Sequence, residues 1–570
     1  MKKLRKTVAV LLALVMVLSL AACTKDTGTE NPTNAPTQEA TQPTKAADKT
    51  EPAKTDDGNK TDTTTPEPTA EPTPEVLPPL AISVSLPSDN EHVADGTNDT
   101  EMQYYQKLID GIEAYTNTDI TWEWLAQATY YDDEHLGLKI ATGDVADVLV
   151  VGKNAAFLDA AENGLFWDLA PYIDEFDNLA TIPEATRQNA SYNGKMYGLP
   201  RSRTLARNGL GYRLDWLNNL GLAEPTTWED FHDMLYAFTY NDPDGNGVDD
   251  TVGLGLDNWS GVFNIMMTWF GVPNEWGLDA SGNLIYKVET EEYKNALKAF
   301  RELYSEGVIN NGANGIPDFR EVDPGKARDQ LLRQSLAGCG VQVLDDQRKV
   351  ETYFEDNGLS TADEPIYTLQ GYVDTGKGPL CYPTTGMNNM IAISTKNIKT
   401  EDQLRRVLGF LNDINDGEML NLIEYGWEGE TYRINDEGYV ELFTAEELEA
   451  NGIGSTKFNF GFNQVIPYFT APANARPVDR NLYTSAITIL EQELYAEDIQ
   501  YCVPNYGASF TSDTYVTQGA DLDKIIADAQ LAFIVGEIDE SGLNEAIKTW
   551  KQGGGDQVTK EMNDLYKASK

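Results

Sequence analysis

The stretch Asp147-Val148-Leu149-Val150-Val151 decides the fold, because it completes an alternation of strands and helices. The run is short and apolar, as expected of a strand buried inside a sheet. The elements expected before it are a strand over 81–86, a helix bearing Met102, Tyr105, Ile109 and Ile112 on one face, a strand over 120–125, and a helical stretch that ends at Ala141. This order predicts a parallel sheet with right-handed crossovers.

The rest of the chain keeps the α/β pattern. Thr227 and Thr400 are predicted to cap helices, and Thr400 forms a capping box with Gln403. Apolar spacing predicts another helix over 293–304. Further strands are expected over 337–344 and 390–394, and mostly helical sequence follows residue 480. A chain of 570 residues is too long for one ordinary core, so we expect two lobes.

The charge of the chain limits its partners. It contains 43 Lys and Arg residues against 91 Asp and Glu, a formal net charge of −48. Nucleic acids and anionic lipid surfaces are excluded as partners, because phosphate contacts need basic side chains. Polyanionic ligands would need a local basic pocket or a metal, so neutral or cationic ligands fit best.

Histidine and cysteine are too sparse for a catalytic metal site. The three histidines have no metalloenzyme spacing, and no C-x-x-C motif occurs. The internal cysteines, Cys339, Cys381 and Cys502, could give one disulfide and one free thiol. We favour the interpretation in which all three cysteines act as small, buried hydrophobic residues.

The N-terminus has the pattern of an exported lipoprotein. Basic residues precede an apolar run over 8–20, and Leu20-Ala21-Ala22-Cys23 resembles the bacterial lipobox, in which the cysteine is acylated and becomes the mature N-terminus. The alternative is a transmembrane anchor, but the run is shorter than the ~20 residues that a span needs. We therefore expect a signal peptide over 1–23, with lipidation at Cys23.

A tether follows the lipobox. Residues 24–79 are rich in Thr and Pro and almost free of large apolar side chains, so they cannot bury a core. We expect a disordered linker that holds the folded body, residues 80–570, outside a membrane. No later apolar run is long enough to span one.

Five segments, taken in order, resemble family 1 extracellular solute-binding proteins, the receptors of carbohydrate ABC importers. They are 138–148, 163–173, 192–200 with 212–217, 225–231 and 425–429. The first is similar to the family's "lasGdlPDv" stretch, although Ala146 stands where proline is usual.

The resemblance implies a two-lobed α/β fold of the periplasmic-binding-protein type, with a ligand cleft between lobes that close on an oligosaccharide. It also implies delivery to the transmembrane subunits of an ABC permease, no catalytic residues, and a monomer. We expect lobe 1 to span about 80–205 and 380–470, and lobe 2 about 206–379 and 471–570. Crossings between the lobes are expected near 201–212, 375–388 and 465–480.

Residues 241–251 predict a structural calcium site. Positions 1, 3, 5, 7 and 9 of an EF-hand-like loop are Asp242, Asp244, Asn246, Val248 and Asp250. Position 12 is Gly253 and not glutamate, so Asp249 or a distant carboxylate would complete the shell. The alternative is a metal-free turn. The resemblance favours Ca²⁺, since related oligosaccharide receptors carry calcium in this loop.

Aromatic faces and planar polar groups are what sugar recognition needs. The candidate ligand-binding residues are Trp259, Trp427, Tyr382, Arg201, Arg203 and Asp144. Trp259 precedes an apolar helix, and Trp427 lies in a glycine-bounded turn. Each has a structural alternative: the arginines could pair with nearby carboxylates. We assign Trp167, Trp216, Trp228 and one of Trp122 and Trp124 to the core.

Two other functions remain open from the sequence alone. An anchored glycoside hydrolase would need two suitably spaced carboxylates, and the many acidic residues offer chance candidates. A peptide receptor on the same fold would suit the acidity if the peptide were cationic. Ligand screening, with a check for sugar cleavage, separates these alternatives from a sugar receptor.

Overall fold

The computed structural model describes residues 77–88, 99–131, 133–258, 261–323, 326–453, 462–466 and 485–570. Cys23, most of the predicted linker and Trp259 lie outside these residues. Among the described helices, none combines the length and the apolar character that crossing a membrane requires.

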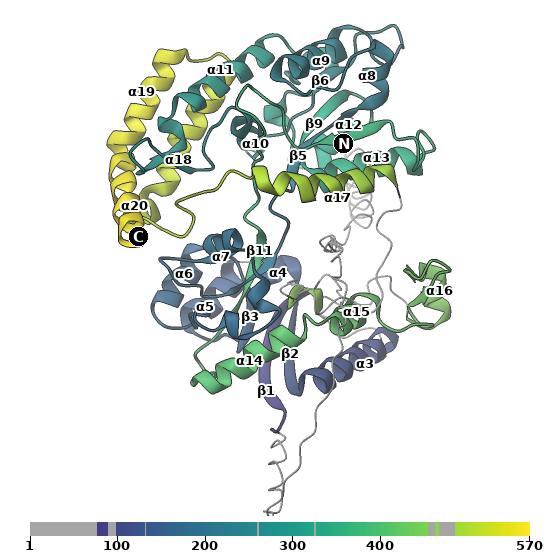
Figure 1. Ribbon diagram of the computed structural model, residues 1–570, viewed down its shortest axis with the longest axis vertical. Helices are drawn as coiled ribbons and strands as arrows, with labels where there is room; N and C mark the ends of the chain where they lie inside the picture. Colours follow the sequence, from purple (N-terminus) through teal and green to yellow (C-terminus); the bar gives the residue numbers. More distant parts are fainter. Residues whose placement is uncertain are drawn as a thin grey trace, which may run out of the picture. The chain divides into compact units, whose positions relative to one another are not determined.

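The first sheet is mixed and has five strands in the order β2-β1-β3-β11-β4 (Figure 1). Its strands are β1 (Leu80–Ser88), β2 (Thr118–Ala126), β3 (Val148–Val151), β4 (Leu199–Ser202) and β11 (Met387–Ile393). β1 pairs in parallel with both β2 and β3, as the sequence predicted. β11 comes from much later in the chain and pairs antiparallel with β3 and β4.

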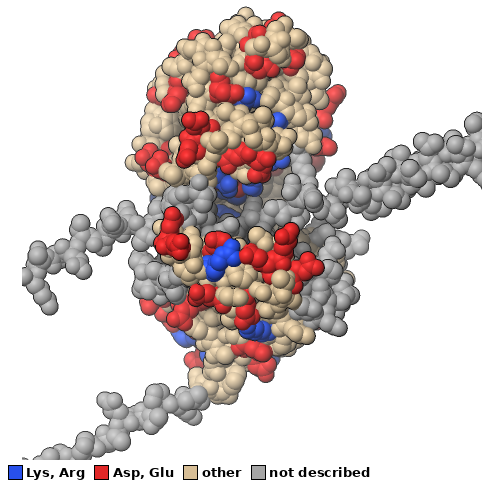
Figure 2. Space-filling view, turned by 90° about the vertical axis from the view of Figure 1, so that its right-hand side faces the viewer, with Lys and Arg blue, Asp and Glu red and all other residues tan. Residues whose placement is uncertain are grey.

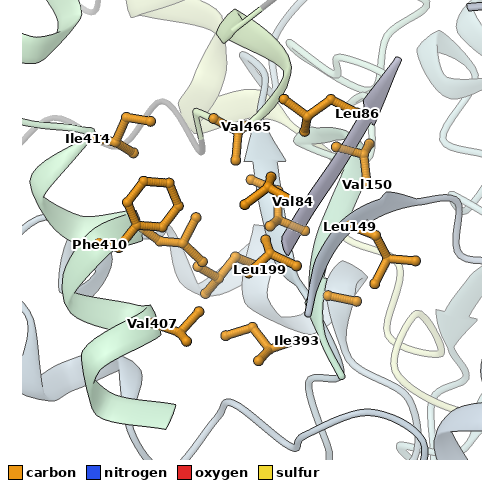
Figure 3. Packing of buried hydrophobic residues seen from close by; sticks show 14 of the residues in the cluster. Val84, Leu86, Leu149, Val150, Leu199, Ile393, Val407, Phe410, Ile414 and Val465 are labelled. Carbon is orange, nitrogen blue, oxygen red and sulfur yellow. The ribbon is translucent and has the colours of Figure 1, made fainter. Parts of the chain in front are cut away.

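Helices pack around this sheet and form the first core. They are α3 (Asp99–Thr116), α4 (Gln127–Tyr130), α5 (Leu138–Thr142), α6 (Ala155–Glu162), α7 (Glu184–Ala190), α14 (Glu401–Asp413), α15 (Gly417–Tyr425) and α16 (Ala445–Ala450). Val407 and Phe410 of α14 lie on the same side of the sheet as Val84, Leu199 and Ile393 (Figure 3). The predicted capping box of Thr400 and Gln403 begins α14. A small hairpin, β12 (Tyr432–Ile434) and β13 (Val440–Leu442), follows α15.

The second sheet has four strands in the order β10-β5-β9-β6. Its strands are β5 (Asn208–Arg213), β6 (Val252–Leu254), β9 (Ala337–Val343) and β10 (Tyr367–Gln370). β5 is antiparallel to β10 and β9, whereas β6 runs parallel to β9. The helices of this part are α8 (Leu214–Leu220), α9 (Trp228–Tyr240), α10 (Gly261–Trp269), α11 (Glu291–Ser305), α12 (Lys326–Arg333) and α13 (Leu344–Asp356).

The C-terminal part is helical, as predicted. Its helices are α17 (Ala486–Asp498), α18 (Asp513–Ile534), α19 (Glu540–Trp550) and α20 (Asp556–Ala568). Leu522, Phe533 and Trp550 join the core that also contains α10 and α11. A short hairpin, β7 (Trp276–Leu278) and β8 (Leu284–Tyr286), contacts α20 through Asn563, which accepts from the Leu284 amide at 2.8 Å.

Acidic side chains are spread widely over the face shown in Figure 2, and basic ones are fewer. Many of the basic side chains are paired, and one pair is fully enclosed. Arg328 Nη1 lies 2.9 Å from Asp257 Oδ2, with the two side chains 4% and 0% exposed. Asp257 lies between β6 and α10, so this ion pair fixes the chain where it leaves the second sheet.

Candidate functional site

Among the described residues, two chain segments join the sheets, and they pair with each other. Residues 203–207 connect β4 to β5, and residues 371–386 connect β10 to β11. The Arg203 amide donates to Gly386 O at 2.8 Å, and the Thr384 amide donates to Leu205 O at 2.9 Å. Asn208 Nδ2 donates to Tyr382 O at 2.9 Å, which continues the pairing into β5. These paired segments bring Arg203 and Tyr382 into one region.

Arg201 and Arg203 lie at the carboxyl edge of the first sheet. β3 and β4 are both antiparallel to β11, so they run in the same direction. β1 is parallel to β3 and therefore runs in that direction too. Arg201 is buried, with Nη1 donating to Asn388 O at 3.4 Å. Arg203 is half-buried, with Nη1 donating to Ser202 O at 3.0 Å. The edge at which the chain leaves the first sheet therefore carries two cations.

Tyr382 begins a polar network in the second core. Burial, with a smaller contribution from the charge of Glu275, raises the pKa of Tyr382 to about 12. A hydrogen bond with Asn264 acts in the opposite direction and lowers this pKa. Asn264 lies in the first turn of α10 and accepts from Lys287 Nζ at 3.1 Å. Lys287 Nζ also donates to Glu275 Oε1 at 2.6 Å. These hydrogen bonds link Tyr382 of the crossing segment to Glu275, which directly precedes β7 of the β7–β8 hairpin.

Glu275 is also part of the wall of a cavity of about 290 Å³. The hairpin, the 505–512 loop and helices α18–α20 enclose it. Its aromatic walls are Trp276, Tyr286, Phe510, Tyr515 and Trp550, and its polar walls include Glu275, Asn505 and Asp523. Tyr286 stacks on Trp550, with ring centroids 5.1 Å apart and planes at 15°. Tyr515 Oη donates to Asp523 Oδ2 at 2.6 Å, and burial raises the pKa of Tyr515.

The 505–512 loop of the cavity also bonds to residues of the first core region. The Asn193 amide donates to Ser509 O at 2.7 Å. Lys153 Nζ, just beyond β3, donates to Ala508 O at 3.3 Å and to Ser191 O at 2.6 Å. Burial lowers the pKa of Lys153 to about 8. The wall of the cavity is thus tied by backbone carbonyls to the carboxyl edge of the first sheet.

Trp427 packs against the first core. Its ring lies against α3, with Lys107 Nζ 4.0 Å from the ring centroid and the Tyr104 ring 6.3 Å away. Lys107 also pairs with Glu430 at 2.8 Å. A cation covers one face of the indole, and the ring also packs against the first core.

Asp144 is not brought together with the other candidates. It lies between α5 and β3, at the amino end of β3, and pairs with Lys396 just beyond the carboxyl end of β11 at 3.0 Å. Because β11 is antiparallel to β3, this edge of the sheet is opposite to the one that carries Arg201. The hydrogen bond from Lys396 lowers the pKa of Asp144.

The remaining tryptophans correct one expectation. Trp122 and Trp124 lie two residues apart on β2 and therefore share a face, so both pack against the first core, where only one was expected to. Both are half-buried and stack, with centroids 5.8 Å apart, and both contact Phe462. Trp216 is fully buried, as expected, and Trp167 and Trp228 are half-buried against the cores.

The cavity aromatics were missed by the sequence reasoning. Trp427 was chosen because glycines bound its turn on both sides, Gly426 and Gly429. Trp276 has a glycine next to it on one side, Gly277, and follows Glu275 on the other. Trp550, Tyr515 and Asp523 gave no such signal, because their convergence depends on how α18 and α19 pack.

The acidic loop after α9 folds around its own side chains. The Gly247 amide donates to Asp242 at 3.0 Å, and Asn246 Nδ2 donates to Asp244 at 2.9 Å and to Asp250 at 3.2 Å. Gly245 and Gly247 have positive φ values, 70° and 81°, which the tight turn requires. Across the described part of the chain, no three His, Cys, Asp or Glu side chains gather closely enough to hold a metal.

The family model described as bacterial extracellular solute-binding protein matches residues 96–316. Lipoprotein LipO of Bacillus subtilis is 34% identical over 474 residues, covering 81% of this chain and 89% of its own. The polygalacturonan/rhamnogalacturonan-binding protein YtcQ of the same organism is 28% identical over 468 residues, with the same coverage of 81% and 89%.

Solved structures show the same fold at low identity. An "HMO binding" ABC-transporter-associated solute-binding protein of Bifidobacterium longum infantis has a TM-score of 0.61 and 18% identity, covering 86% of this chain and 98% of its own. An EF-hand mutant of the substrate-binding protein FusA from Streptococcus pneumoniae, in complex with fructo-nystose, has a TM-score of 0.56 and 15% identity, covering 86% and 99%.

Proposed function

The chain belongs to the family of bacterial extracellular solute-binding proteins, and on this premise we propose that it captures an oligosaccharide for an ABC importer. The predicted two-lobed α/β fold agrees with that of its structural neighbours. Proteins of this family bind a solute and do not convert it, so we propose no catalytic residues.

The observation that carries this proposal is the cavity beside the β7–β8 hairpin. Its volume of about 290 Å³ is close to the lower end of the range of roughly 300–1,000 Å³ for ligand pockets. Stacked Tyr286 and Trp550 and the nearby Trp276 offer flat apolar surfaces for the C–H faces of a sugar ring. Asp523 and Asn505 offer oxygen acceptors for its hydroxyl groups.

The charges around the cavity favour a neutral sugar ring in it. Glu275 and Asp523 would repel a uronate carboxylate, whereas hydroxyl groups can donate to both. Arg201 and Arg203, at the sheet edge near the crossing, would suit a carboxylate on another ring of the same oligosaccharide. The name of YtcQ supports an acidic, rhamnose-containing polysaccharide as one source of such ligands.

Asp523→Asn tests this assignment. Asp523 is exposed on α18, so the substitution should leave the fold intact while weakening a hydrogen bond from the sugar. A charged hydrogen bond is worth about 1.5–3 kcal/mol, so we expect the Kd to rise about ten- to a hundredfold. The matched control is Asp528→Asn, on the same helix and paired only with Lys524.

Titration calorimetry with neutral, galacturonate and rhamnogalacturonate oligosaccharides is the measurement, and chromatography afterwards should recover intact sugar. Binding of a sugar that is equally strong in both variants would place the ligand elsewhere. Release of shorter sugars would support the hydrolase alternative, and binding of cationic peptides alone would change the ligand class.

We propose that the paired segments 203–207 and 371–386 act as the hinge; most of the third crossing predicted near 465–480 lies outside the described residues. Lobe 1 would then comprise residues 80–202 with 387–453 and 462–466, and lobe 2 residues 208–370 with 485–570. A ligand shifts such a two-lobed protein towards the closed form to the extent that it binds the closed form more tightly than the open form. Small-angle X-ray scattering should show a smaller radius of gyration with sugar, and no change would contradict hinge closure.

We propose that Ca²⁺ is a structural ligand of the loop after α9. The oxygen atoms of Asp242, Asp244, Asn246 and Asp250, with the Val248 carbonyl, are the hard ligands that Ca²⁺ prefers. The FusA structure described as an EF-hand mutant supports calcium loops on this fold. Asp244→Asn should abolish a calcium-dependent rise in Tm, whereas Asp436→Asn, in an exposed turn, should not. An unchanged Tm with EDTA would contradict the assignment.

We also propose that Cys23 carries a lipid anchor on the extracellular side of the cell membrane. The lipobox and the similarity to Lipoprotein LipO support this location. Cys23→Ser should prevent incorporation of a labelled palmitate analogue and remove the protein from the membrane fraction. Retention of the variant with its label would refute the assignment.

A further inference from the structure

Two of the internal cysteines lie opposite each other. Cys381, in the second crossing segment, and Cys502, after α17, form an isolated parallel β-bridge. The Cys381 amide donates to Tyr501 O at 2.9 Å, and the Val503 amide donates to Cys381 O at 3.0 Å. Hydrogen bonds on both sides of Cys381 fix the register, so the pairing does not depend on side-chain placement.

This geometry suits a disulfide. Neighbouring β-strands lie about 4.8 Å apart, within the Cα separation of about 4.4–6.8 Å that disulfides need. Residues paired directly across a bridge also project to the same face. Cys381 is buried and Cys502 half-buried, and both are thiols in the structure. Cys339, by contrast, is buried on β9 between its own strand neighbours.

We propose that Cys381 and Cys502 form a disulfide when the chain folds outside the cell, where oxidising conditions allow such bonds to persist. The bond would fix the crossing segment next to Tyr382 to the segment that leads into the cavity loop at Asn505. The inference uses the extracellular location that we propose, but it does not depend on which ligand binds.

The oxidant is a low-molecular-weight disulfide such as oxidised glutathione. One cysteine thiolate attacks it, forming a mixed disulfide and releasing one thiolate. The second cysteine attacks the mixed disulfide, the protein S–S bond forms, and a second thiolate leaves. The two protons of the protein thiols end on the two released thiols, so two cysteines are oxidised and one external disulfide is reduced.

The surroundings of the pair favour oxidation during folding over oxidation afterwards. Asp498, which is 4% exposed, lies close to both thiols. Burial first, then the Asp498 charge, raises the pKa of Cys502 to about 12 and that of Cys381 as well. Thiolates are the reactive form, so exchange in the folded protein is slow in either direction.

The test is a peptide map of the full chain, extracted from its membrane in N-ethylmaleimide without reductant. Trypsin places the three cysteines in separate peptides, 334–348, 378–396 and 481–524. We expect 378–396 and 481–524 to be linked and lighter by two hydrogen atoms, with Cys339 alkylated. Full alkylation of all three cysteines, in this sample and after refolding in oxidised and reduced glutathione, would overturn the proposal, as would a link to Cys339.

A second measurement covers the case in which a variant folds poorly. Reductant during refolding should lower the Tm of the wild-type chain and leave that of Cys381→Ala/Cys502→Ala unchanged. An equal response of both proteins would count against the bond. Oligosaccharide titration of the same samples is read separately, so failure of the disulfide and failure of the receptor assignment are distinguishable.

Discussion

Removing one partner of the enclosed Arg328–Asp257 ion pair should be strongly destabilising. Arg328 also donates to Gln342 and to Asp329, so its guanidinium is held from several directions. In Asp257→Ala the guanidinium stays at a site where only 4% of its side chain is exposed, without its 2.9 Å carboxylate. Removing one partner of a buried pair costs about 3–5 kcal/mol. Asp329 still pairs with Arg328 at 3.3 Å, which places the expected loss towards the lower end of that range.

The loss should be visible as a fall in Tm of roughly 6–20 °C, because each kcal/mol shifts the Tm of a 150–250-residue domain by about 2–4 °C. Differential scanning calorimetry and urea unfolding followed by tryptophan fluorescence would measure it. Asp528→Asn is the control, since its exposed pair with Lys524 should contribute less than about 1 kcal/mol.

The double variant Asp257→Leu/Arg328→Met separates charge from packing. Apolar residues of similar volume often replace a buried pair without loss, so the double variant should be more stable than Asp257→Ala by about 2 kcal/mol or more. A cost of Asp257→Ala below about 1 kcal/mol would refute the reasoning, as would additive losses in the double variant. Because Asp257 precedes α10, we also expect weaker sugar binding in the single variant.

Three further predictions concern buried groups. Burial, with a smaller contribution from the charge of Glu497, raises the pKa of Asp498 from 3.8 to about 6. The stability that Asp498 contributes is therefore present below pH 3.8 and is lost as the pH rises through 6. Urea unfolding of Asp498→Asn should not show this loss. Burial lowers the pKa of Lys153 from 10.5 to about 8, so the free energy of unfolding of the wild-type chain should increase as the pH rises from 8 to 10.5. Lys153→Met should lack this increase, and an equal dependence on pH in both proteins would contradict the prediction. A Cβ on Gly371 would clash with Asp498 Oδ2, so Gly371→Ala should cost about 1–3 kcal/mol, whereas Gly137→Ala, with no atom within 4 Å of its Cβ, should cost nothing.

The parts of the fold that sequence predicted are those fixed by local chemistry. The strands near 81–86, 120–125 and 147–151 form the parallel part of the first sheet, since each carries its own apolar pattern. Thr227 and Thr400 make the capping boxes that begin α9 and α14. A strand was expected over 390–394, where β11 lies, but its antiparallel pairing with β3 and β4 was not predicted. The pairing with β4 joins segments about 190 residues apart in the sequence.

The candidate site was harder to predict because it depends on strand direction and helix packing. Asp144 and Arg201 are both loop or strand-end residues, yet the direction of β11 puts them on opposite edges of one sheet. Tyr382 could be chosen because a crossing segment was expected around it. The stack of Tyr286 on Trp550 joins a hairpin to α19, and neither residue has a local pattern that differs from that of a core aromatic residue.

The hydrogen bonds around the cavity indicate how occupancy could be coupled to closure. A ligand shifts a conformational equilibrium only by the difference between its interactions in the two states. The 505–512 loop lines the cavity and also accepts from Lys153 and Asn193 near the first sheet. A sugar ring that orders this loop would lower the cost of making those two hydrogen bonds. Tyr382 links the same cavity, through Asn264 and Lys287, to the paired crossing segments, so the residues that would contact the ligand and those that would bend belong to one connected network.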